Sequence, residues 1–421
     1  MFYGHRHRLP DYGRLHLRKK NMKASRMKFI DIYAGLPLCA ILFALHKTVS
    51  VFRRKPSSRE IKNMLFIKFW GMGTIILASP SVKAIRAKYP DARATFMTFT
   101  RNEAVCRLLG LADDYVTVDV KRGFVRFIVD TAAAIVRLRA KGIDMAVDLE
   151  FFTRFSAIVG YLSGARSRVG FKSWEAWRGD LLTASAPFNR YWHVWKNFGS
   201  LAVAAGADFD PSALPRIADG ELAPSVKSFD VKFNRLAAGG EDIVCVNPNS
   251  AVEFDWPRRW PDANYAELAV ALADKYRCRV VIIGGADDVA CAEAIERAAA
   301  RGDRVVNLAG KTSVGDLAAL LKKSRLLVTN DSGPMHLAAA LGTTVAAFFG
   351  ASTPALTRPL GEGHLVFFKN LECSPCINLV TNDKIRCYHR APKCLDGITV
   401  GEVLGAIEAS GVLRRRSAVV L

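Results

Sequence analysis

The chain has 421 residues, of which 50% are hydrophobic and 24% are charged. This balance excludes a largely disordered or fibrous protein, and the length suits two globular domains better than one. The net charge is +21, and residues 1–60 hold fourteen Lys or Arg against three acids, about half of the excess. Such a basic segment serves nucleic acid, an anionic membrane or an anionic substrate.

An apolar run of fourteen residues from Ile32 to Leu45 lies inside this basic segment and contains Pro37. A spanning helix needs about 20 apolar residues, so we expect a peripheral anchor in the membrane interface. A secretory signal, a full span and a buried helix are the alternatives, although Leu45-His46-Lys47 offers no small-residue cleavage site. Nucleic-acid binding is disfavoured because the basic block flanks an apolar run.

Short β-rich runs alternate with helical stretches from Met64 onward. The first series predicts strands at 64–69, 95–99, 115–118 and 144–148 and helices at 75–88, 103–109 and 125–139. The second predicts strands at 243–247, 279–283, 304–307, 325–329 and 344–349 and helices at 263–276, 288–300, 314–323 and 335–341. Residues 171–240 look less regular and end in a Pro- and Ala-rich linker. Two such series predict two doubly wound α/β domains that bind ligands at the carboxyl ends of their strands.

The clearest motif is Asp331-Ser332-Gly333-Pro334-Met335-His336, between an expected strand and an expected helix. The first turn of a helix leaves N–H groups free, and with the helix dipole these can bind phosphate. Gly333 allows a close approach, and Pro334 needs no donor at an early helical position. Plain capping of the helix by Asp331 or Ser332 explains the same residue types, so the motif alone leaves both interpretations open.

The next strand ends in Phe348-Phe349-Gly350-Ala351-Ser352-Thr353-Pro354. With this pair of motifs the chain resembles glycosyltransferase family 9, the heptosyltransferases that build the inner core of lipopolysaccharide. Members of that family carry a D-[ST]-G-x-x-H-[LA] helix start followed by a strand ending in F-G-x-[ST]-x-P. The resemblance covers about Met64 to Ser410.

The resemblance implies a GT-B fold, in which two Rossmann-like domains face a cleft. We expect a basic N-terminal extension with the apolar membrane-associating segment at 1–60. An acceptor-side domain at 61–225 and a domain at 226–421 that binds the nucleotide sugar would follow.

Upstream motifs extend the resemblance. Asn247-Pro248-Asn249-Ser250 and Arg258-Arg259-Trp260-Pro261 resemble elements that face the phosphates of the donor, although for Trp260-Pro261 we favour packing at a helix start. Asp287 stands where the family has an acid that bonds the ribose hydroxyls, and capping of the next helix is the alternative. Lys311-Thr312-Ser313 resembles a nucleotide-side loop, but an N-cap at Thr312 or Ser313 is the simpler account. The residues expected to bind the donor are Asn249, Ser250, Arg258, Arg259, Asp287, Asp331, Ser332, Gly333, Pro334 and His336.

Lys68-Phe69-Trp70-Gly71-Met72-Gly73-Thr74 resembles the N-terminal loop of the family, with Gly71, Gly73 and Thr74 facing the acceptor. The family has an Asp at the position of Thr74, and that Asp is the proposed general base. Threonine does not ionise in the useful range. Asp148 and Glu150 are the expected substitutes, and a capped strand end with a solvated acid is the equal alternative.

The resemblance implies transfer of a heptose or similar sugar from a nucleotide-diphosphate sugar, such as an ADP-heptose-like donor, to a lipopolysaccharide-core or other lipid-linked saccharide. No Asp-x-Asp motif follows a strand of the second half, which favours metal-independent transfer without a catalytic cofactor. We expect a cytoplasmic protein, peripheral on the inner face of the bacterial inner membrane, that binds an anionic membrane surface and no nucleic acid. Because of Thr74, a catalytically silent protein that binds a nucleotide sugar is the alternative function.

Four of the nine cysteines, Cys373, Cys376, Cys387 and Cys394, crowd into 22 residues with the spacing C-x2-C-x10-C-x6-C. Clustered cysteines near this spacing suit a structural zinc ion, which is more common than disulfides in a cytosolic enzyme. Reduced thiols and a redox pair are the alternatives. The other five cysteines look like ordinary buried thiols.

Overall fold

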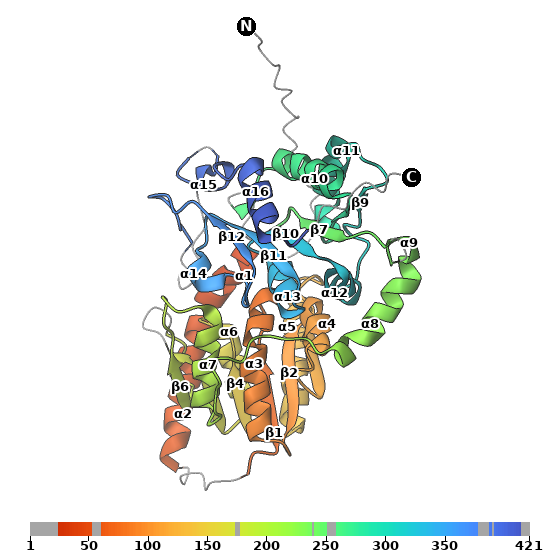
Figure 1. Cartoon of the computed structure of the whole chain (residues 1–421). Coiled ribbons are helices and arrows are strands. Elements are labelled where there is room, and N and C mark those ends of the chain that lie inside the picture. Colours follow the sequence, from red (N-terminus) through yellow and green to blue (C-terminus); the bar gives the residue numbers. More distant parts are fainter. Residues whose placement is uncertain are drawn as a thin grey trace.

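The computed structural model describes residues 24–52, 60–172, 177–237, 240–250, 258–377, 387–389 and 391–413. These residues form two α/β domains, one above the other in Figure 1, and helix α8 (Asp219–Lys232) lies in the connection between them. Residues 1–23 and 53–59, which carry much of the predicted basic extension, lie outside the described residues.

The N-terminal domain contains a parallel sheet with the strand order β3-β2-β1-β4-β5-β6. Its strands are β1 (Asn63–Ile67), β2 (Arg93–Phe99), β3 (Asp114–Val118), β4 (Met145–Asp148), β5 (Ser167–Lys172) and β6 (Ala184–Pro187). The direction of winding reverses between β1 and β4. A crevice at the carboxyl ends of these two strands is the usual ligand position in such a sheet.

The C-terminal domain repeats this plan with the order β12-β11-β10-β7-β8-β9. Its strands are β7 (Ile243–Asn247), β8 (Arg279–Ile282), β9 (Val305–Asn307), β10 (Leu326–Asn330), β11 (Thr344–Phe349) and β12 (Leu365–Phe368). Here the winding reverses between β7 and β10. The expectation of two doubly wound domains is therefore confirmed.

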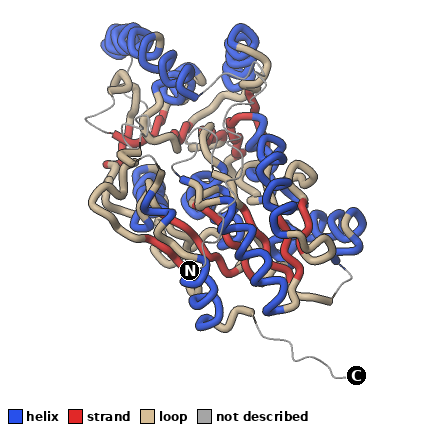
Figure 2. Tube along the Cα trace, turned by 90° about the horizontal axis from the view of Figure 1, so that it is seen from above, coloured by secondary structure: helices blue, strands red, loops and turns tan. Residues whose placement is uncertain are grey.

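Helices cover both faces of each sheet, so that the strands lie inside (Figure 2). In the N-terminal domain and the connection they are α3 (Met72–Lys88), α4 (Glu103–Leu108), α5 (Phe124–Ala140), α6 (Arg154–Leu162), α7 (Val194–Ala204), α8 and α9 (Asn234–Ala237). In the C-terminal domain they are α10 (Asp262–Tyr276), α11 (Val289–Ala299), α12 (Val314–Lys323), α13 (Gly333–Ala340), α14 (Pro354–Thr357), α15 (Lys393–Asp396) and α16 (Val400–Ser410).

Alternate side chains of β1 separate the two layers of helices, because successive strand residues point to opposite faces. Leu65 and Ile67 pack with side chains of α5 and α6. Phe66, on the other face, packs with side chains of α3 and α7. Both faces of the sheet are therefore covered, which explains the nearly continuous apolar sequence of β1.

The structure adds regular elements to the segment that looked irregular. β6 and α7 lie within residues 171–240, and the aromatic residues Trp195 and Phe198 of α7 are buried in the core. The predicted linker runs into α8, which has Pro224 inside it, and the predicted boundary between residues 225 and 226 falls in that helix. The strand β6 has only four residues and α8 contains a proline, and both features weaken a periodic signal.

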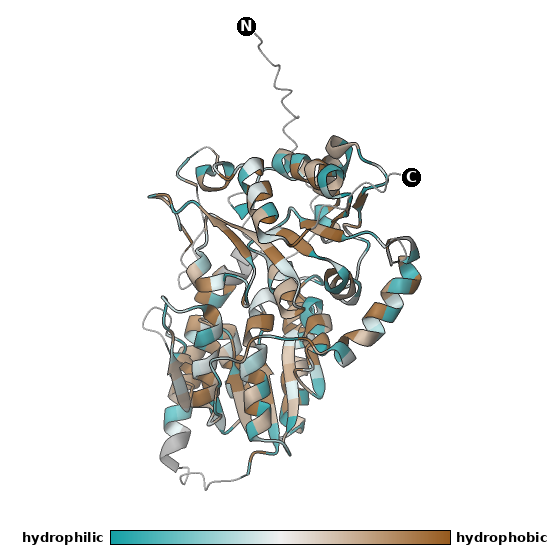
Figure 3. Ribbon diagram, in the orientation of Figure 1, coloured by the Kyte–Doolittle hydropathy of each residue, from teal (hydrophilic) through white to brown (hydrophobic). Residues whose placement is uncertain are grey.

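Helices α1 (Ala24–Tyr33) and α2 (Gly35–Phe52) form one long N-terminal helix, interrupted only at Ala34, that runs along the N-terminal domain (Figure 1). The N–H groups of Ala34 and Leu38 donate to the carbonyls four residues before them, so helical hydrogen bonding continues across the break in this α1–α2 helix. Cys39 and Leu42 of α2 are buried against Ile158 of α6. The segment Phe29–Thr48 is long and apolar enough to cross a membrane by length and composition, and 17% of its apolar window is buried. A mostly buried helix is therefore not what the structure contains; Figure 3 shows the hydropathy of its residues in the view of Figure 1.

The side chain of Asp31 joins the α1–α2 helix to α6. Its carboxylate accepts hydrogen bonds from the backbone N–H groups of Arg154 and Phe155 at 3.2 and 2.9 Å, and it pairs with the Arg154 guanidinium at 3.6 Å. Thr153, at the N-cap position of α6, makes no side-chain capping bond. A side chain from α1 therefore caps α6 in its place.

Replacing Asp31 by Ala should lower the free energy of unfolding by about 1–2 kcal/mol, because two N–H groups at the start of α6 lose their acceptor. Urea denaturation followed by circular dichroism measures this loss. Asp303→Ala, at an exposed loop position, is the control. Equal losses in the two variants would contradict the capping role.

Candidate active site

The two domains meet where helices α3 and α13 begin. A Cβ atom added at Gly73 would lie 2.5 Å from Cδ2 of His336, and one added at Gly333 would lie 2.6 Å from Cε of Met72. Glycine at these two positions therefore allows the helix starts to touch. Both helices turn the positive ends of their dipoles toward this point, which favours an anionic ligand there.

The side chains at the start of α13 do not cap it. Ser332 occupies the N-cap position, but its hydroxyl lies 3.0 Å from Nδ2 of Asn247 and 3.0 Å from Oγ1 of Thr329. The Asp331 carboxylate likewise accepts from other groups, the Arg258 guanidinium and the Ser352 hydroxyl. Plain capping, the alternative explanation of this motif, is therefore not what the structure contains, and the N–H groups of the first turn stay available.

Asp331 orients an arginine from a distant part of the chain. Its carboxylate accepts from Nη2 of Arg258 at 2.5 Å and from Oγ of Ser352 at 2.6 Å, and its backbone carbonyl accepts from the same guanidinium at 2.9 Å. Asp331 is 6% exposed. The two predicted motifs after β10 and β11 and the basic pair near Arg258 thus converge on one ion pair at the carboxyl edge of the sheet.

Three polar atoms near this ion pair have no hydrogen-bond partner among the described residues. They are Oδ1 of Asn249, Oγ of Ser250 and Nδ1 of His336, and all three residues are buried. An unpaired buried polar atom costs about 1–3 kcal/mol, so such atoms in a native structure need an explanation. A polar ligand that reaches all three supplies it.

His336 is neutral at physiological pH. Burial lowers the pKa of its imidazole to about 4, and the Asp331 charge opposes this shift only in part. Its Cδ2 edge faces Gly73 of the other domain. His336 therefore presents an uncharged imidazole where the two helices meet.

The turn after β8 is fixed by Asp288 and not by Asp287. The Asp288 carboxylate accepts from the Gly285 N–H at 2.8 Å and lies 3.8 Å from Nη2 of Arg259. Asp287 is exposed. The capping alternative for Asp287 is wrong, and its carboxylate stays open to solvent.

Two other local expectations are confirmed. Ser313 is the N-cap of α12, where its hydroxyl accepts from the Asp316 N–H at 3.0 Å. Trp260 is fully buried and packs on Phe348 with ring centroids 4.4 Å apart, immediately before α10. Both residues stabilise local structure.

On the N-terminal side, Glu150 holds the loop between β1 and α3. Its carboxylate accepts from the N–H groups of Phe69 and Trp70 at 2.6 and 2.8 Å and from Nζ of Lys68 at 3.0 Å. Glu150 and Lys68 are both buried. Glu150 thus forms an ion pair and two hydrogen bonds that fix the loop carrying Gly71 and Gly73.

Both carboxylate oxygens of Asp148 also accept hydrogen bonds. The carboxylate accepts from Nη1 of Arg178 at 2.7 Å, from Oγ of Ser156 at 2.9 Å and from the Glu150 N–H at 3.0 Å. Burial raises the pKa of this carboxyl to about 6, and the Arg178 charge opposes the shift. The alternative of a solvated acid is wrong for both carboxylates, because both are buried and paired. Their role as bases stays a prediction.

Thr74 lies in the first turn of α3. Its hydroxyl donates to the Trp70 carbonyl at 2.8 Å, with the Gly71 carbonyl at 2.9 Å. Gly71 has φ of 79°, in the left-handed region that favours glycine.

The sequence did not predict that Lys68 pairs with Glu150 or that Arg178 pairs with Asp148. Of these two basic partners, only Lys68 lies inside a motif, the Gly-rich loop, that could have indicated a functional role.

The four clustered cysteines line a cavity of about 60 Å³ together with His389. Within the described part of the chain no three Cys, His, Asp or Glu side chains are arranged as ready metal ligands. The cysteine segment braces the loop after β11, because the N–H groups of Cys376 and Ile377 both donate to the Ala351 carbonyl. Ser352, the next residue, is the one that contacts Asp331.

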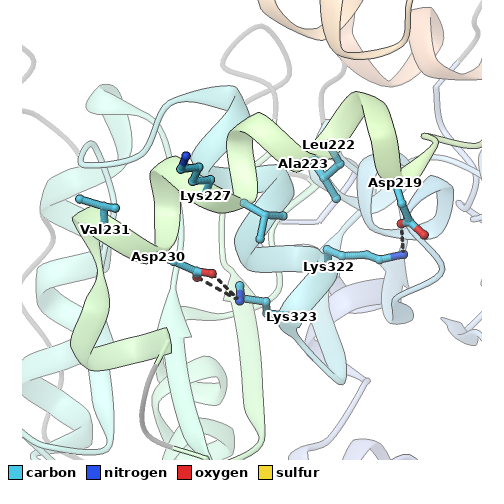
Figure 4. Close-up of a pocket in the computed structure, with 9 residues that line it drawn as sticks. Asp219, Leu222, Ala223, Lys227, Asp230, Val231, Lys322 and Lys323 are labelled. Carbon is cyan, nitrogen blue, oxygen red and sulfur yellow. Dashed lines mark hydrogen bonds and ion pairs between the residues drawn. The ribbon is translucent and has the colours of Figure 1, made fainter.

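A larger cavity lies elsewhere. Side chains of the packed helices α8 and α12 line a space of about 770 Å³ (Figure 4). It is crossed by the surface ion pairs Lys322–Asp219 and Lys323–Asp230. None of the predicted site residues lines it, so size alone does not identify the site.

Comparisons with known proteins agree with this geometry. The model of glycosyltransferase family 9 (heptosyltransferase) matches residues 132–388. Lipopolysaccharide heptosyltransferase 2 of Escherichia coli K12 is 30% identical over 236 residues, 53% of this chain and 65% of that protein. The chain spans about half to two thirds of the length of the first curated relatives it matches.

Solved structures show the same fold. Escherichia coli ADP-heptose lipopolysaccharide heptosyltransferase II superposes with a TM-score of 0.64 at 24% identity, over 83% of this chain and 98% of that one. The dodecameric iron-containing heptosyltransferase TibC, in complex with ADP-D-beta-D-heptose, superposes with a TM-score of 0.52 at 13% identity, over 85% and 80%. The expected GT-B fold is confirmed.

Removing the imidazole of His336 should reduce the sensitivity of the fold to acid. The unfolded chain binds a proton near pH 6.5 and the folded chain only near pH 4, so His336 destabilises the fold progressively as the pH falls between these values. The stability advantage of the native chain over His336→Gln should shrink by about 2 kcal/mol between pH 7.5 and 5.0.

Urea unfolding of both proteins at the two pH values measures this change. Asp148 and His193, whose pKa values are also shifted, contribute to both proteins and cancel in the comparison. A difference in stability that does not vary with pH would contradict the burial of a neutral His336.

Proposed function

Because the chain belongs to glycosyltransferase family 9, we propose that it transfers a heptose or similar sugar from a nucleotide-diphosphate sugar to a lipopolysaccharide-core or other lipid-linked saccharide. The observation that carries the proposal is the Arg258–Asp331 ion pair beside the uncapped start of α13. The unpaired polar atoms around it support a polar ligand at this position.

The diphosphate of the donor would lie at the start of α13. Its negative oxygens would accept from the free N–H groups of the first turn and from the Arg258 guanidinium. Gly333 and Pro334 leave room for this approach. Oγ of Ser250, the Asn249 side chain and the His336 imidazole would take up further polar groups of the donor, which satisfies their unpaired atoms.

The ribose would lie farther along the edge of the sheet, toward β8. Asp287 is exposed after that strand, and its carboxylate can accept from the two ribose hydroxyls. Arg259 is held by Asp288 nearby. This placement uses most of the predicted donor residues, whereas the Ser332 hydroxyl is bonded to Asn247 and Thr329.

The proposed reaction places negative charge on the leaving nucleoside diphosphate. The acceptor oxygen forms a bond to the anomeric carbon of the sugar, the bond from that carbon to the phosphate oxygen breaks, and the hydroxyl proton leaves to a base. The nucleoside diphosphate departs with added negative charge, which the dipole of α13 and Arg258 stabilise. We propose that this transfer needs no metal ion.

Asp148 and Glu150 remain our candidates for the base. They follow β4 at the crevice of the first sheet, and Thr74 offers no ionisable group. Burial raises the pKa of Asp148 to about 6, which suits a general base. Its action requires that the acceptor displace the Arg178 contact.

A catalytically silent protein that binds a nucleotide sugar is the second candidate function. The observation that favours it is that both carboxylates at the end of β4 are buried in ion pairs while Thr74 replaces the acid. Binding of a nucleotide sugar without sugar transfer or donor hydrolysis would support this function instead.

We place the protein on the cytoplasmic face of the bacterial inner membrane, as a peripheral protein. Seven large apolar side chains of the α1–α2 helix are exposed although this helix is docked on α6: Phe29, Ile32, Tyr33, Leu36, Leu38, Ile41 and Leu45. Their contact with the lipid interface would bring the cleft close to a lipid-linked acceptor.

The four clustered cysteines would hold one structural metal ion. Cys373, Cys376, Cys387 and Cys394 share a cavity, and four thiolates suit zinc or iron in tetrahedral geometry. The spacing favours zinc, and TibC, which has the same fold, contains iron. The ion would brace the loop that places Ser352 against Asp331.

Arg258→Ala or Asp331→Ala should reduce donor turnover by about 100-fold or more, because the leaving diphosphate loses its cation or the cation loses its position. Release of the nucleoside diphosphate in the presence of an acceptor extract measures this. Arg301→Ala, which removes an exposed ion pair with Asp274, is the matched control. Full activity of either site variant would exclude the proposed donor site.

Purified protein should contain about one zinc or iron ion per chain by elemental analysis. Cys373→Ser and Cys394→Ser should each lose the ion, because a tetrahedral site with three thiolates binds more weakly. Cys291→Ser, a half-buried thiol elsewhere, should keep it. A metal-free chain with four freely reactive thiols in the cluster would exclude the metal site.

A further inference from the structure

Helix α5 has an apolar face on each side. Its inner face, with Phe127, Thr131, Ala134 and Leu138, is buried on the first sheet. The outer face of such a helix is ordinarily polar. Here it carries five exposed large apolar side chains: Phe124 (44% exposed), Val125 (76%), Ile128 (49%), Val129 (51%) and Val136 (67%).

Basic residues surround this outer face. Residues 121–141 contain six basic side chains and one acid. They are Lys121, Arg122, Arg126, Arg137, Arg139 and Lys141, against Asp130. Most of them stand at the two ends of the helix, so an apolar centre is flanked by positive charge, which is the pattern of helices that lie in an anionic lipid interface.

Helix α5 also lies on the same side of the first sheet as the α1–α2 helix. α5 and α6 pack on one face of the first sheet, and the α1–α2 helix docks on α6. Among the described residues, nineteen large apolar side chains are exposed, of which seven lie on the α1–α2 helix and five on α5. Exposed apolar surface is therefore concentrated on two elements that both contact α6.

We propose that α5 and the α1–α2 helix together form one lipid-binding surface, whose occupant is an anionic bilayer. The proposal rests on the proposed function insofar as a lipid-linked acceptor gives this surface its purpose. The α1–α2 helix supplies most of the apolar area, and α5 adds a second contact line on the other side of α6. Two lines of contact fix the orientation of the domain on the bilayer, which one line does not.

The test is the double variant Val125→Glu/Val129→Glu in the full chain. Both side chains point outward, so the core is unchanged, and unchanged thermal unfolding confirms this. Val203→Glu/Val231→Glu is the matched control, because these valines are 61% and 78% exposed on α7 and α8. Co-sedimentation with vesicles of phosphatidylcholine containing phosphatidylglycerol measures binding.

The α5 variant should bind these vesicles at least about 10-fold more weakly than the control variant, because two apolar contacts are lost and two negative charges face an anionic surface. In the native chain, amide hydrogen exchange of residues 124–136 should slow when the vesicles are added. Equal binding by the two variants, or unchanged exchange in α5, would overturn the proposal.

Two further outcomes identify other occupants. If the α5 variant converts a dimer to a monomer in light scattering while vesicle binding is unchanged, a second copy of the chain covers this face. If the α5 contribution is equally strong with pure phosphatidylcholine, the anionic part of the proposal is wrong. Thermal stabilisation of both variants by nucleotide sugars reports on the donor site separately, so its loss would count against the proposed function and not against the lipid surface.

Discussion

The close approach of α3 and α13 is the constraint on which the site depends. It exists because Gly73 and Gly333 have no side chains, and any Cβ atom there would enter the space of His336 or Met72. The approach brings the positive ends of two helices from different domains to one point. An anion bound there, such as the diphosphate of the proposed donor, would contact both domains at once.

Buried charges keep the N-terminal side of this contact in place. Glu150 fixes the loop before α3, and Asp148 ties the end of β4 to Arg178 and to α6. Removing one partner of a buried ion pair leaves an uncompensated charge and destabilises strongly. These contacts make the two carboxylates effective supports of the loop, and either one would act as the proposed base only after a change in its contacts.

The sequence predicted the architecture well because long apolar strands and amphipathic helices carry periodic signals. The nine predicted strands correspond to nine of the twelve strands in the described part of the chain, and Ser313 and Trp260 have the local roles expected of them. What the sequence did not predict are long-range pairs. Arg178 meets Asp148 across 30 residues and Lys68 meets Glu150 across 82, and nothing in local periodicity specifies such partners. Asp331 looked like a cap for the same reason, since its partner Arg258 is 73 residues away.

Helix α6 links the proposed lipid surface to the proposed acceptor side. Asp31 of the α1–α2 helix caps the first turn of α6, and Ser156 in the same turn bonds Asp148. On the far side, Gly179 packs against the Cys39 carbonyl of α2, immediately after the Arg178 that pairs with Asp148. The α1–α2 helix, α6 and the loop after β4 are thus one packed unit. A bilayer that holds the α1–α2 helix and α5 would also hold this loop, and so present the proposed acceptor side at a fixed height above the lipid from which the acceptor would come.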